Sequence, residues 1–234
     1  MKFIVEQKVF DQLEDVCFGV VFAKDINNRT NINQVSQLLT SSIQQIEAQF
    51  ASQKVKEAEK IMPYRQAYSK LGINPNKFMS SIEALASRIS KKKGFPEINP
   101  IVDLGNAISL KYLVPLGAHD VDSATGDIVV RFSHMGDKFI PFGEEAVEVL
   151  EEGELIYAAG DQVKTRRWIW RQSEAGKITE DSRNIFFPID GFNGKNRDSV
   201  IAARDELADL LKSLFCSEVQ VGFVDRENPQ LTFK

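Results

Sequence analysis

Residues 99–122 read NPIVDLGNAISLKYLVPLGAHDVD, a mostly apolar stretch that polar side chains interrupt. Its apolar residues recur at helical spacing, which predicts a helix over residues 101–112 that begins after Pro100 and ends before Pro115. The polar side chains on this helix share one face: Asp103, Asn106 and Ser109. Polar groups on an apolar helix need partners, so this row predicts either a site or a buried hydrogen-bond network.

Three further polar residues, His119, Asp120 and Asp122, follow the helix. Each polar residue of the stretch also has a purely structural interpretation. Asp103 suits a cap or brace at the start of its own helix, and Asn106 suits a buried network. His119 suits a hydrogen-bonded position in a loop, and the two aspartates suit loop caps before the next strand.

The N-terminal side of this stretch predicts a strand followed by helices. Residues 16–25, VCFGVVFAKD, form a continuous apolar run of strand length, which is typical of a buried central strand. Residues 33–60 carry one apolar face at helical spacing. Residues 62–78 contain two prolines and a glycine, so we expect a break in regular structure there. Ser80 and Glu83 then have the spacing of a capping box at the start of a short helix.

The C-terminal side is rich in predicted strands. Short β-type runs occur at residues 126–133, 153–159, 166–173, 184–190 and 217–224. In the third run, alternation would place Trp168, Trp170 and Gln172 on one face and Arg171 and Ser173 on the other. Residues 198–215 form an amphipathic helix that would pack on a sheet. The order of elements predicts an α+β fold, with a mixed or antiparallel sheet core and packed helices.

Charge and hydropathy exclude several classes of protein. A formal net charge of −4 gives no overall attraction to nucleic acid, so any RNA contact needs a local patch. Two basic groups, Lys91 to Lys93 and Lys164 to Arg171, are either such patches or solvated edges. No apolar run is long enough to span a membrane, and the first residues do not resemble a signal peptide. We expect a cytoplasmic protein whose partners include neither a membrane nor DNA.

Cofactor and metal motifs are not found in the sequence. Cys17 and Cys216 each lie in an apolar run, which predicts buried free thiols. His119 and His134 lack the spacing of zinc ligands, so we expect no metal and no cofactor. The glycines of residues 191–199, GFNGKNRDS, miss the spacing of a phosphate loop, and no GxSxG elbow occurs.

The stretch from Asn99 to Asp120 resembles a segment of the bacterial phenylalanyl-tRNA synthetase β subunit. That segment, from the B3/B4 editing domain, reads roughly N-x-V-V-D-V-T-N-Y-V-x-x-E-x-G-Q-P-L-H-A-F-D. The positions that agree without a gap are Val102, Asp103, Asn106, Pro115, Leu116, Ala118 and Asp120. Residues 127–143, DIVVRFSHMGDKFIPFG, and residues 152–161, EGELIYAAGD, resemble later parts of the same domain.

The resemblance implies a division of the chain. It is closest over residues 95–192 and implies a B3/B4-like domain over residues 63–234. Residues 1–62 are then an N-terminal strand and helix that pack on the core, so that the chain is one compact unit. Free-standing proteins that carry this domain without a synthetase body are the most similar kind.

The resemblance also names positions of an editing site, which in the synthetase hydrolyses wrongly attached tyrosine from tRNA. Asn106 stands at the position of the asparagine associated with that site. Gly117 stands where that family has a histidine, and His119 lies two residues further on. Pro188 stands where the family has a glutamate. Two of three editing positions therefore differ.

The candidate catalytic residues are Asn106, Ser109 and His119. An aminoacyl ester is already activated, so a positioned water and donors for the oxyanion can suffice for its hydrolysis. Asn106 and Ser109 are candidate donors, and His119 is a candidate base. Asp103 and Asp120 are candidate partners for the ammonium group of the amino acid.

The candidate contacts to an unpaired RNA 3′ end are Arg65, Tyr68, Arg171 and Ser173. Two functions follow from the residues and the resemblance together. The first is a trans-acting aminoacyl-tRNA deacylase, an ester hydrolase whose partner is the aminoacylated 3′ end of tRNA. The second is a noncatalytic module that binds tRNA or a free amino acid in the same pocket.

Overall fold

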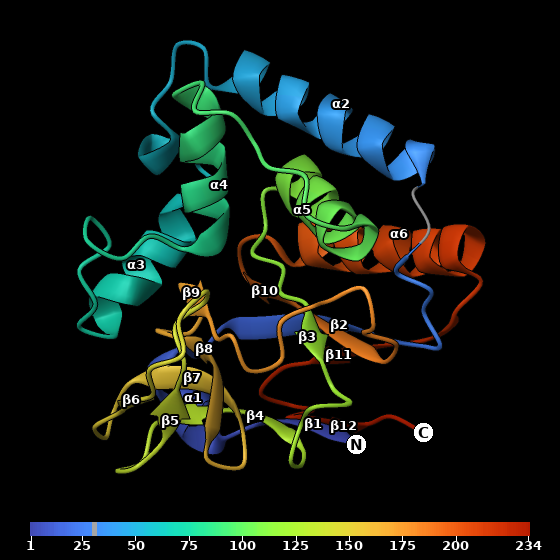
Figure 1. Cartoon of the computed structure of the whole chain (residues 1–234). Coiled ribbons are helices and arrows are strands. Elements are labelled where there is room, and N and C mark those ends of the chain that lie inside the picture. Colours follow the sequence, from blue (N-terminus) through green and yellow to red (C-terminus); the bar gives the residue numbers. More distant parts are fainter. Residues whose placement is uncertain (30–31) are drawn as a thin grey trace.

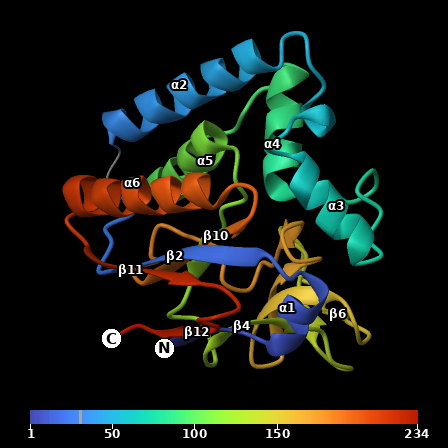
Figure 2. The ribbon, with the colours of Figure 1, turned by 180° about the vertical axis from the view of Figure 1, so that it is seen from behind.

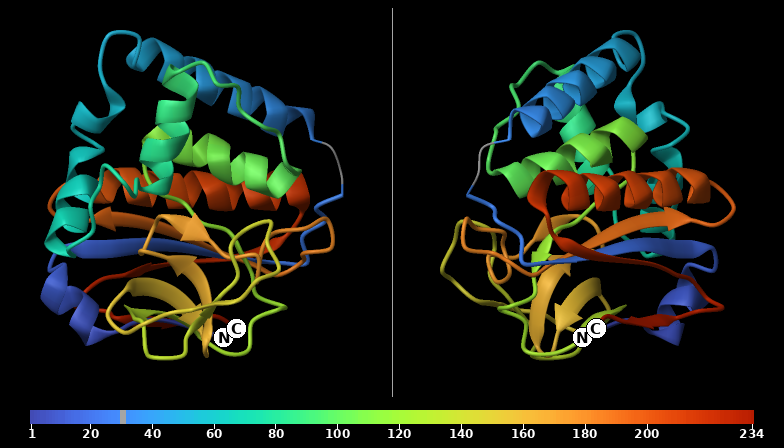
Figure 3. Two further views of the ribbon diagram at one scale, coloured as in Figure 1. Left: turned by 60° about the vertical axis from the view of Figure 1, so that its left-hand side comes forward. Right: turned by 90° about the vertical axis from the view of Figure 1, so that its right-hand side faces the viewer.

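The computed structural model describes residues 1–29 and 32–234 and stacks helices and two sheets in layers (Figures 1 and 3). Helix α2 (Asn33–Gln49) is outermost, and α5 (Pro100–Tyr112) and α6 (Arg197–Phe215) form the layer beneath it. A four-stranded sheet lies under these helices, and an eight-stranded sheet lies under that. The α+β fold with packed helices is confirmed.

The smaller sheet is antiparallel, and its central strands are buried on both faces. Its order is β11 (Glu218–Val224), β2 (Val16–Lys24), β10 (Ile185–Phe192) and β3 (His119–Asp120). Along β2, Phe18 and Val20 join the core between the sheets, whereas Val21 and Ala23 join the core under the helices. Burial of both faces explains why the strand reads as one continuous apolar run.

The larger sheet is mixed and brings the two termini together. In spatial order its strands are β12 (Gln230–Thr232), β1 (Lys2–Val5), β4 (Ile128–Phe132), β7 (Leu155–Ala159), β8 (Gln162–Arg166), β5 (Lys138–Phe139) and β6 (Glu148–Val149). A further strand, β9 (Arg171–Gln172), pairs with β8, and helix α1 (Gln7–Gln12) follows β1. Because β1 and β12 are antiparallel neighbours, the N- and C-termini lie side by side (Figure 2).

Helix α6 packs closely on β2. Its apolar stripe includes Val200, Leu207 and Leu211, which are fully buried, as the amphipathic pattern predicts. A Cβ at Gly19 of β2 would lie only 2.9 Å from Cγ1 of Val200. The glycine therefore permits the short distance between strand and helix.

Both helix starts predicted near the decisive stretch are confirmed. Asn99 caps α5 by accepting a hydrogen bond from the Val102 N–H at 3.0 Å. Leu113 adopts a left-handed conformation that ends α5. Ser80 caps α4 (Ser81–Ser90) by accepting from the Glu83 N–H at 3.4 Å.

Two helix boundaries differ from the prediction. The helix expected over residues 33–60 ends at Gln49, because the chain turns there to bury Phe50 and, through the short 3-10 helix η1 (Val55–Glu57), Val55. Residues 62–78 were expected to be irregular, yet they begin with α3 (Met62–Lys70). Proline in the first turn of α3 is tolerated because its missing N–H would have no partner in the helix.

The single strand expected over residues 166–173 is wrong. Arg167 and Trp168 have φ angles of 46° and 60°, in the left-handed region, so β8 ends and the chain turns before β9. Trp168 is thereby carried into the core, where it is fully buried.

The two thiols also differ from one another. Cys17 is buried in β2, and its pKa is raised to about 12, chiefly by burial. Cys216, expected to be buried, is exposed at the left-handed residue that ends α6.

A buried ion pair fixes the turn between β4 and β5. Arg131 donates to both carboxylate oxygens of Asp137, at 2.6 and 2.8 Å, and both side chains are less than one-tenth exposed. Burial acts to raise the pKa of Asp137, but hydrogen bonds from Arg131 and from the His134 N–H outweigh it and hold the pKa below its ordinary value.

Asp137→Ala is expected to lower the free energy of unfolding by about 3 kcal/mol, because it leaves Arg131 buried without its partner. Urea denaturation at pH 7 measures this loss. Asp161→Ala is the matched control, since the Lys138–Asp161 pair is 57% exposed on both sides and should contribute less than about 1 kcal/mol. Equal losses in the two variants would contradict the role given to the buried pair.

Candidate functional site

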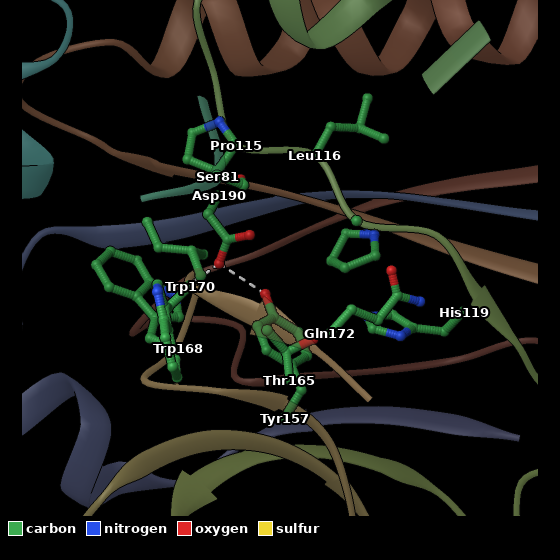
Figure 4. A pocket seen from close by; sticks show the side chains of 13 residues that line it. Ser81, Pro115, Leu116, His119, Tyr157, Thr165, Trp168, Trp170, Gln172 and Asp190 are labelled. Atoms are coloured by element: carbon green, nitrogen blue, oxygen red, sulfur yellow. Dashed lines mark hydrogen bonds between the residues drawn. The ribbon is translucent and has the colours of Figure 1, made fainter. Parts of the chain in front are cut away.

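A pocket opens between β10 of the smaller sheet and β7 and β8 of the larger sheet, beside the start of α4 (Figure 4). It holds about 410 Å³ measured out to its mouth, a size typical of small-ligand sites. We call it the aromatic pocket. Its principal lining residues are Pro115, His119, Tyr157, Trp168, Trp170 and Asp190.

Asp190 presents a buried carboxylate to the aromatic pocket (Figure 4). Its Oδ1 accepts hydrogen bonds from the Tyr157 hydroxyl and the Trp168 indole N–H, both at 2.6 Å. Within residues 1–29 and 32–234, no hydrogen bond reaches its Oδ2. One oxygen is therefore held in place, and the other is available to a ligand.

The acidity of Asp190 is strongly perturbed. Burial raises its pKa to about 7, although the hydrogen bonds from Tyr157 and Trp168 act in the opposite direction. A cation in the pocket would favour the ionised carboxylate, and the surrounding aromatic faces would add cation–π attraction. Buried carboxylates with such pKa values occur at functional sites more often than elsewhere. The aromatic pocket is therefore complementary to a positively charged group.

The aromatic walls are held rigidly from behind. The Tyr64 hydroxyl donates to the Asp190 carbonyl at 2.8 Å, and the Tyr68 hydroxyl donates to the Arg167 carbonyl at 3.0 Å. The rings of both tyrosines lie 6.4 Å from that of Trp168. These contacts keep Trp168 in position in spite of its unusual backbone conformation.

His119 lines the aromatic pocket from β3. Its ring stacks on Tyr157, with 5.9 Å between centroids, and the residue is only 2% exposed. Burial, with a smaller contribution from the nearby Lys164 charge, lowers its pKa to about 3, so the imidazole is neutral at pH 7. Its Nδ1 is buried without a hydrogen-bond partner among the described residues. A buried unpaired nitrogen costs stability, so the histidine is not explained by packing alone.

A second pocket adjoins the first. Leu116, Gly117 and Gln172 line both, and the second pocket continues to Asn106 of α5 and to Phe142 after β5. Asn106 is partly exposed there, and its carboxamide makes no hydrogen bond to any described residue. Asn106 and His119 thus line different pockets that share one wall.

The two candidate serines lie outside both pockets. The Ser109 hydroxyl is buried and donates to the Val114 carbonyl at 2.6 Å, which secures the end of α5. The Ser173 hydroxyl is fully buried and donates to the Ile140 carbonyl at 3.1 Å. Neither hydroxyl faces a ligand in this structure.

The carboxylates expected to pair with an ammonium group bind the protein backbone and side chains instead. Asp103 accepts from the Ile98 N–H at 3.0 Å and so braces the chain before α5. Asp120 accepts from the Asp122 N–H at 2.9 Å and from the Ser182 hydroxyl. Asp190 is the carboxylate that faces the aromatic pocket.

The candidate RNA contacts are dispersed. Arg65 joins α3 to α4 through Glu83, with 2.6 Å between Nη1 and Oε1, and Tyr68 is buried behind Trp168. Arg171 is partly exposed and faces Glu144 at 3.4 Å. The structure does not bring these residues together around one pocket.

Of the two basic groups, only the first is free on the surface. Lys91, Lys92 and Lys93 are exposed after α4. In the second group Lys164 is fully buried, and Arg166 pairs with Glu148 and Glu154. Arg167 also contacts Glu154, at 3.6 Å, so acidic neighbours balance this group.

Comparison with known families matches the B3/4 domain to residues 63–215 of the chain. The chain belongs to the B3/4 domain family. Similar curated proteins are phenylalanine–tRNA ligase β subunits, among them those of Idiomarina loihiensis (31% identity over 112 residues) and Colwellia psychrerythraea (31% over 117 residues). These matches cover 46% and 49% of this chain but only 14% of each relative's length.

A solved structure shares the fold of this B3/4 protein. An N-terminal fragment of the phenylalanyl-tRNA synthetase β subunit from Pyrococcus horikoshii superimposes with a TM-score of 0.51 at 12% identity. The superposition covers 93% of this chain and 49% of the fragment. It therefore includes elements that precede the matched family region.

The B3/4 protein carries an imidazole and a carboxylate near the two changed family positions. His119 lies two residues beyond Gly117, and Asp190 lies two residues beyond Pro188, and all four line the aromatic pocket. Residues two apart on an extended chain point to the same side. A Cβ at Gly117 would lie 3.2 Å from His119 Nε2 and 3.3 Å from Pro188 Cγ, so these two side chains fill the space beside the glycine.

Sequence reasoning missed Asp190, Tyr157 and the role of Trp168. Asp190 had a detectable signal, since it is the one charged residue within β10, a strand that is buried along its whole length. The contact between Trp168 and Asp190 had none, because it depends on a turn that the alternating pattern of residues 166–173 conceals.

Two searches of the described residues complete the site. Among residues 1–29 and 32–234, no cluster of three or more His, Cys, Asp or Glu side chains is arranged to bind a metal ion. In the same part of the chain, no helix combines the length and apolar character that crossing a membrane requires.

Proposed function

We propose that this B3/4 protein acts on aminoacyl-tRNA and hydrolyses the ester of a wrongly attached amino acid in trans. The observation that carries the proposal is the buried Asp190 carboxylate, which faces the aromatic pocket with one oxygen unpaired. Similarity to phenylalanine–tRNA ligase β subunits supports the substrate class, and the aromatic pocket supports recognition of the amino acid.

Asp190 pairs with the α-ammonium of the amino acid in this proposal. Tyr157 and Trp168 hold the carboxylate and surround the cation with aromatic faces. The amino acid side chain then contacts apolar wall residues such as Ile169 and Pro188. A second pocket of this kind can reject amino acids that a synthetase does not distinguish by binding alone.

His119 positions the attacking water. A neutral imidazole accepts a hydrogen bond from water, but with its pKa lowered to about 3 it is a weak proton acceptor. Because the ester is already activated, orientation of the water supplies much of the required rate. Ser109 and Ser173 hold the surrounding backbone in this account and do not touch the substrate.

A noncatalytic binding module is the second candidate. The low basicity of His119 favours it, together with the engagement of both candidate serines in backbone hydrogen bonds. Such a module would bind an aminoacyl group or a free amino acid through Asp190 without turnover.

The boundaries and location of the protein belong to the same proposal. We place the functional domain at residues 63–234, with residues 1–62 packed on it, and β1 and β2 of that segment lie within the two sheets. A tRNA substrate implies action in the cytoplasm, with neither a membrane nor DNA as partner.

Release of labelled amino acid from a panel of mischarged tRNAs tests the proposed reaction. We expect selective turnover by the purified protein, with one amino acid or a small group released well above the spontaneous rate. Absence of release from every tRNA, with binding of an amino acid still measurable by calorimetry, would contradict the hydrolase and leave the binding module.

A further inference from the structure

The second pocket has two apolar side chains at its mouth that packing does not require. Ile98 is 56% exposed and Phe142 is 54% exposed, and both line this pocket. Large apolar side chains exposed beside a pocket are typical of surfaces that contact a flat or apolar ligand. An exposed aromatic face in particular suits stacking on a nucleobase.

Asn106 supplies directional polar groups in the same pocket. It projects from α5, is partly exposed, and has no hydrogen-bond partner among the described residues. A carboxamide offers one acceptor and two donors, which match the exocyclic amine and the adjacent ring nitrogen of adenine. The neighbouring helix residue is Gly105, so no side chain covers Asn106 on that side of the pocket.

The charge and the connection of the second pocket also suit an RNA end. Lys177 lines it and is partly exposed, with Glu174 as its partner. Leu116, Gly117 and Gln172 are shared with the aromatic pocket, so a ligand that fills both must cross this common wall. An aminoacyl ester of a terminal nucleoside has two such parts, joined through the ribose.

We propose that the second pocket binds the unpaired adenosine at the 3′ end of tRNA. Phe142 stacks on the base, Asn106 hydrogen-bonds its edge, and Lys177 lies near a phosphate. The inference rests on the proposed function for its choice of ligand, and it reassigns Asn106 from the reaction itself to recognition of the base.

Binding of short RNA tests this inference without any reaction. The probes are the trinucleotides CCA and CCC, each labelled with a fluorophore at its 5′ end and titrated with the full-length protein. We expect CCA to bind more tightly than CCC. Phe142→Ala is expected to weaken CCA binding about 10-fold, from the loss of one stacked base. Phe142→Trp should restore it, and Asn106→Ala should reduce the preference for CCA over CCC.

Val149→Ala is the matched control, because Val149 is 64% exposed and lines neither of these two pockets. Its CCA affinity should equal that of the wild type. Equal binding of CCA and CCC by the wild type, or no loss on Phe142→Ala, would overturn the inference.

Parallel deacylation assays separate this inference from the proposed function. Loss of CCA binding in Phe142→Ala, with no ester hydrolysed by the wild type, would keep the adenosine site and reject the hydrolase. Ester hydrolysis by the wild type with an unchanged KM in Phe142→Ala and Asn106→Ala would keep the hydrolase and reject the adenosine site. The inference predicts a raised KM and a nearly unchanged kcat in both variants.

Discussion

Asp190→Asn is expected to lower kcat/KM for aminoacyl-tRNA hydrolysis about 100-fold. Asparagine keeps an oxygen that can accept from Tyr157 and Trp168, so the pocket retains its shape, but it loses the charge that pairs with the ammonium group. Removing one partner of a buried charge pair costs about 2 to 5 kcal/mol, and about 3 kcal/mol corresponds to that loss in rate.

Initial rates at limiting substrate measure this change at matched folding stability. Asp161→Asn is the control, because Asp161 is exposed, pairs with Lys138 and lines neither pocket. The control should keep the wild-type rate. If Asp190→Asn kept it as well, Asp190 would have no part in substrate binding.

The same substitution is expected to remove a pH dependence of stability. The folded-state pKa of Asp190, about 7, lies above its ordinary value of 3.8 because the carboxyl group is buried. Between these values the folded protein holds a proton that the unfolded chain has released, so the free energy of unfolding falls as pH rises from about 4 to about 7. The full effect is about 4 kcal/mol and persists above pH 7.

Urea denaturation of the wild type and Asp190→Asn at pH 5 and pH 8 measures this effect. Other carboxylates titrate in both proteins, so the difference between them isolates Asp190. We expect the variant to gain on the wild type by several kcal/mol between the two pH values. Parallel curves would show that the Asp190 pKa is near its ordinary value. Greater stability with lower activity would mark Asp190 as a residue kept for function.

Much of the fold was predictable because its elements follow simple patterns. The apolar run of β2 and the stripe of α6 each report burial directly, and the caps of α4 and α5 follow from Ser80 and Asn99. The errors occurred where tertiary contacts override local pattern. The chain leaves the α2 helix to bury Phe50, and Trp168 leaves the strand pattern to reach Asp190.

The candidate site was less predictable because its groups come from separate segments. Asn106 and His119 were identified from one stretch, yet they line adjoining pockets. The carboxylate comes from β10, about seventy residues later in the chain, and its partners Tyr157 and Trp168 come from the larger sheet and the turn after β8. Sequence spacing does not report which of several aspartates is left without a partner after folding.

The most direct test of the account compares one tRNA ester in two forms, with the amino group free and with it acetylated. Acetylation removes the cation that Asp190 is proposed to bind and leaves the ester unchanged. The account predicts that the wild type hydrolyses the free form at least about 10-fold faster, and that Asp190→Asn does not distinguish the two forms. Equal hydrolysis of both forms by the wild type, or a preference that persists undiminished in Asp190→Asn, would contradict it.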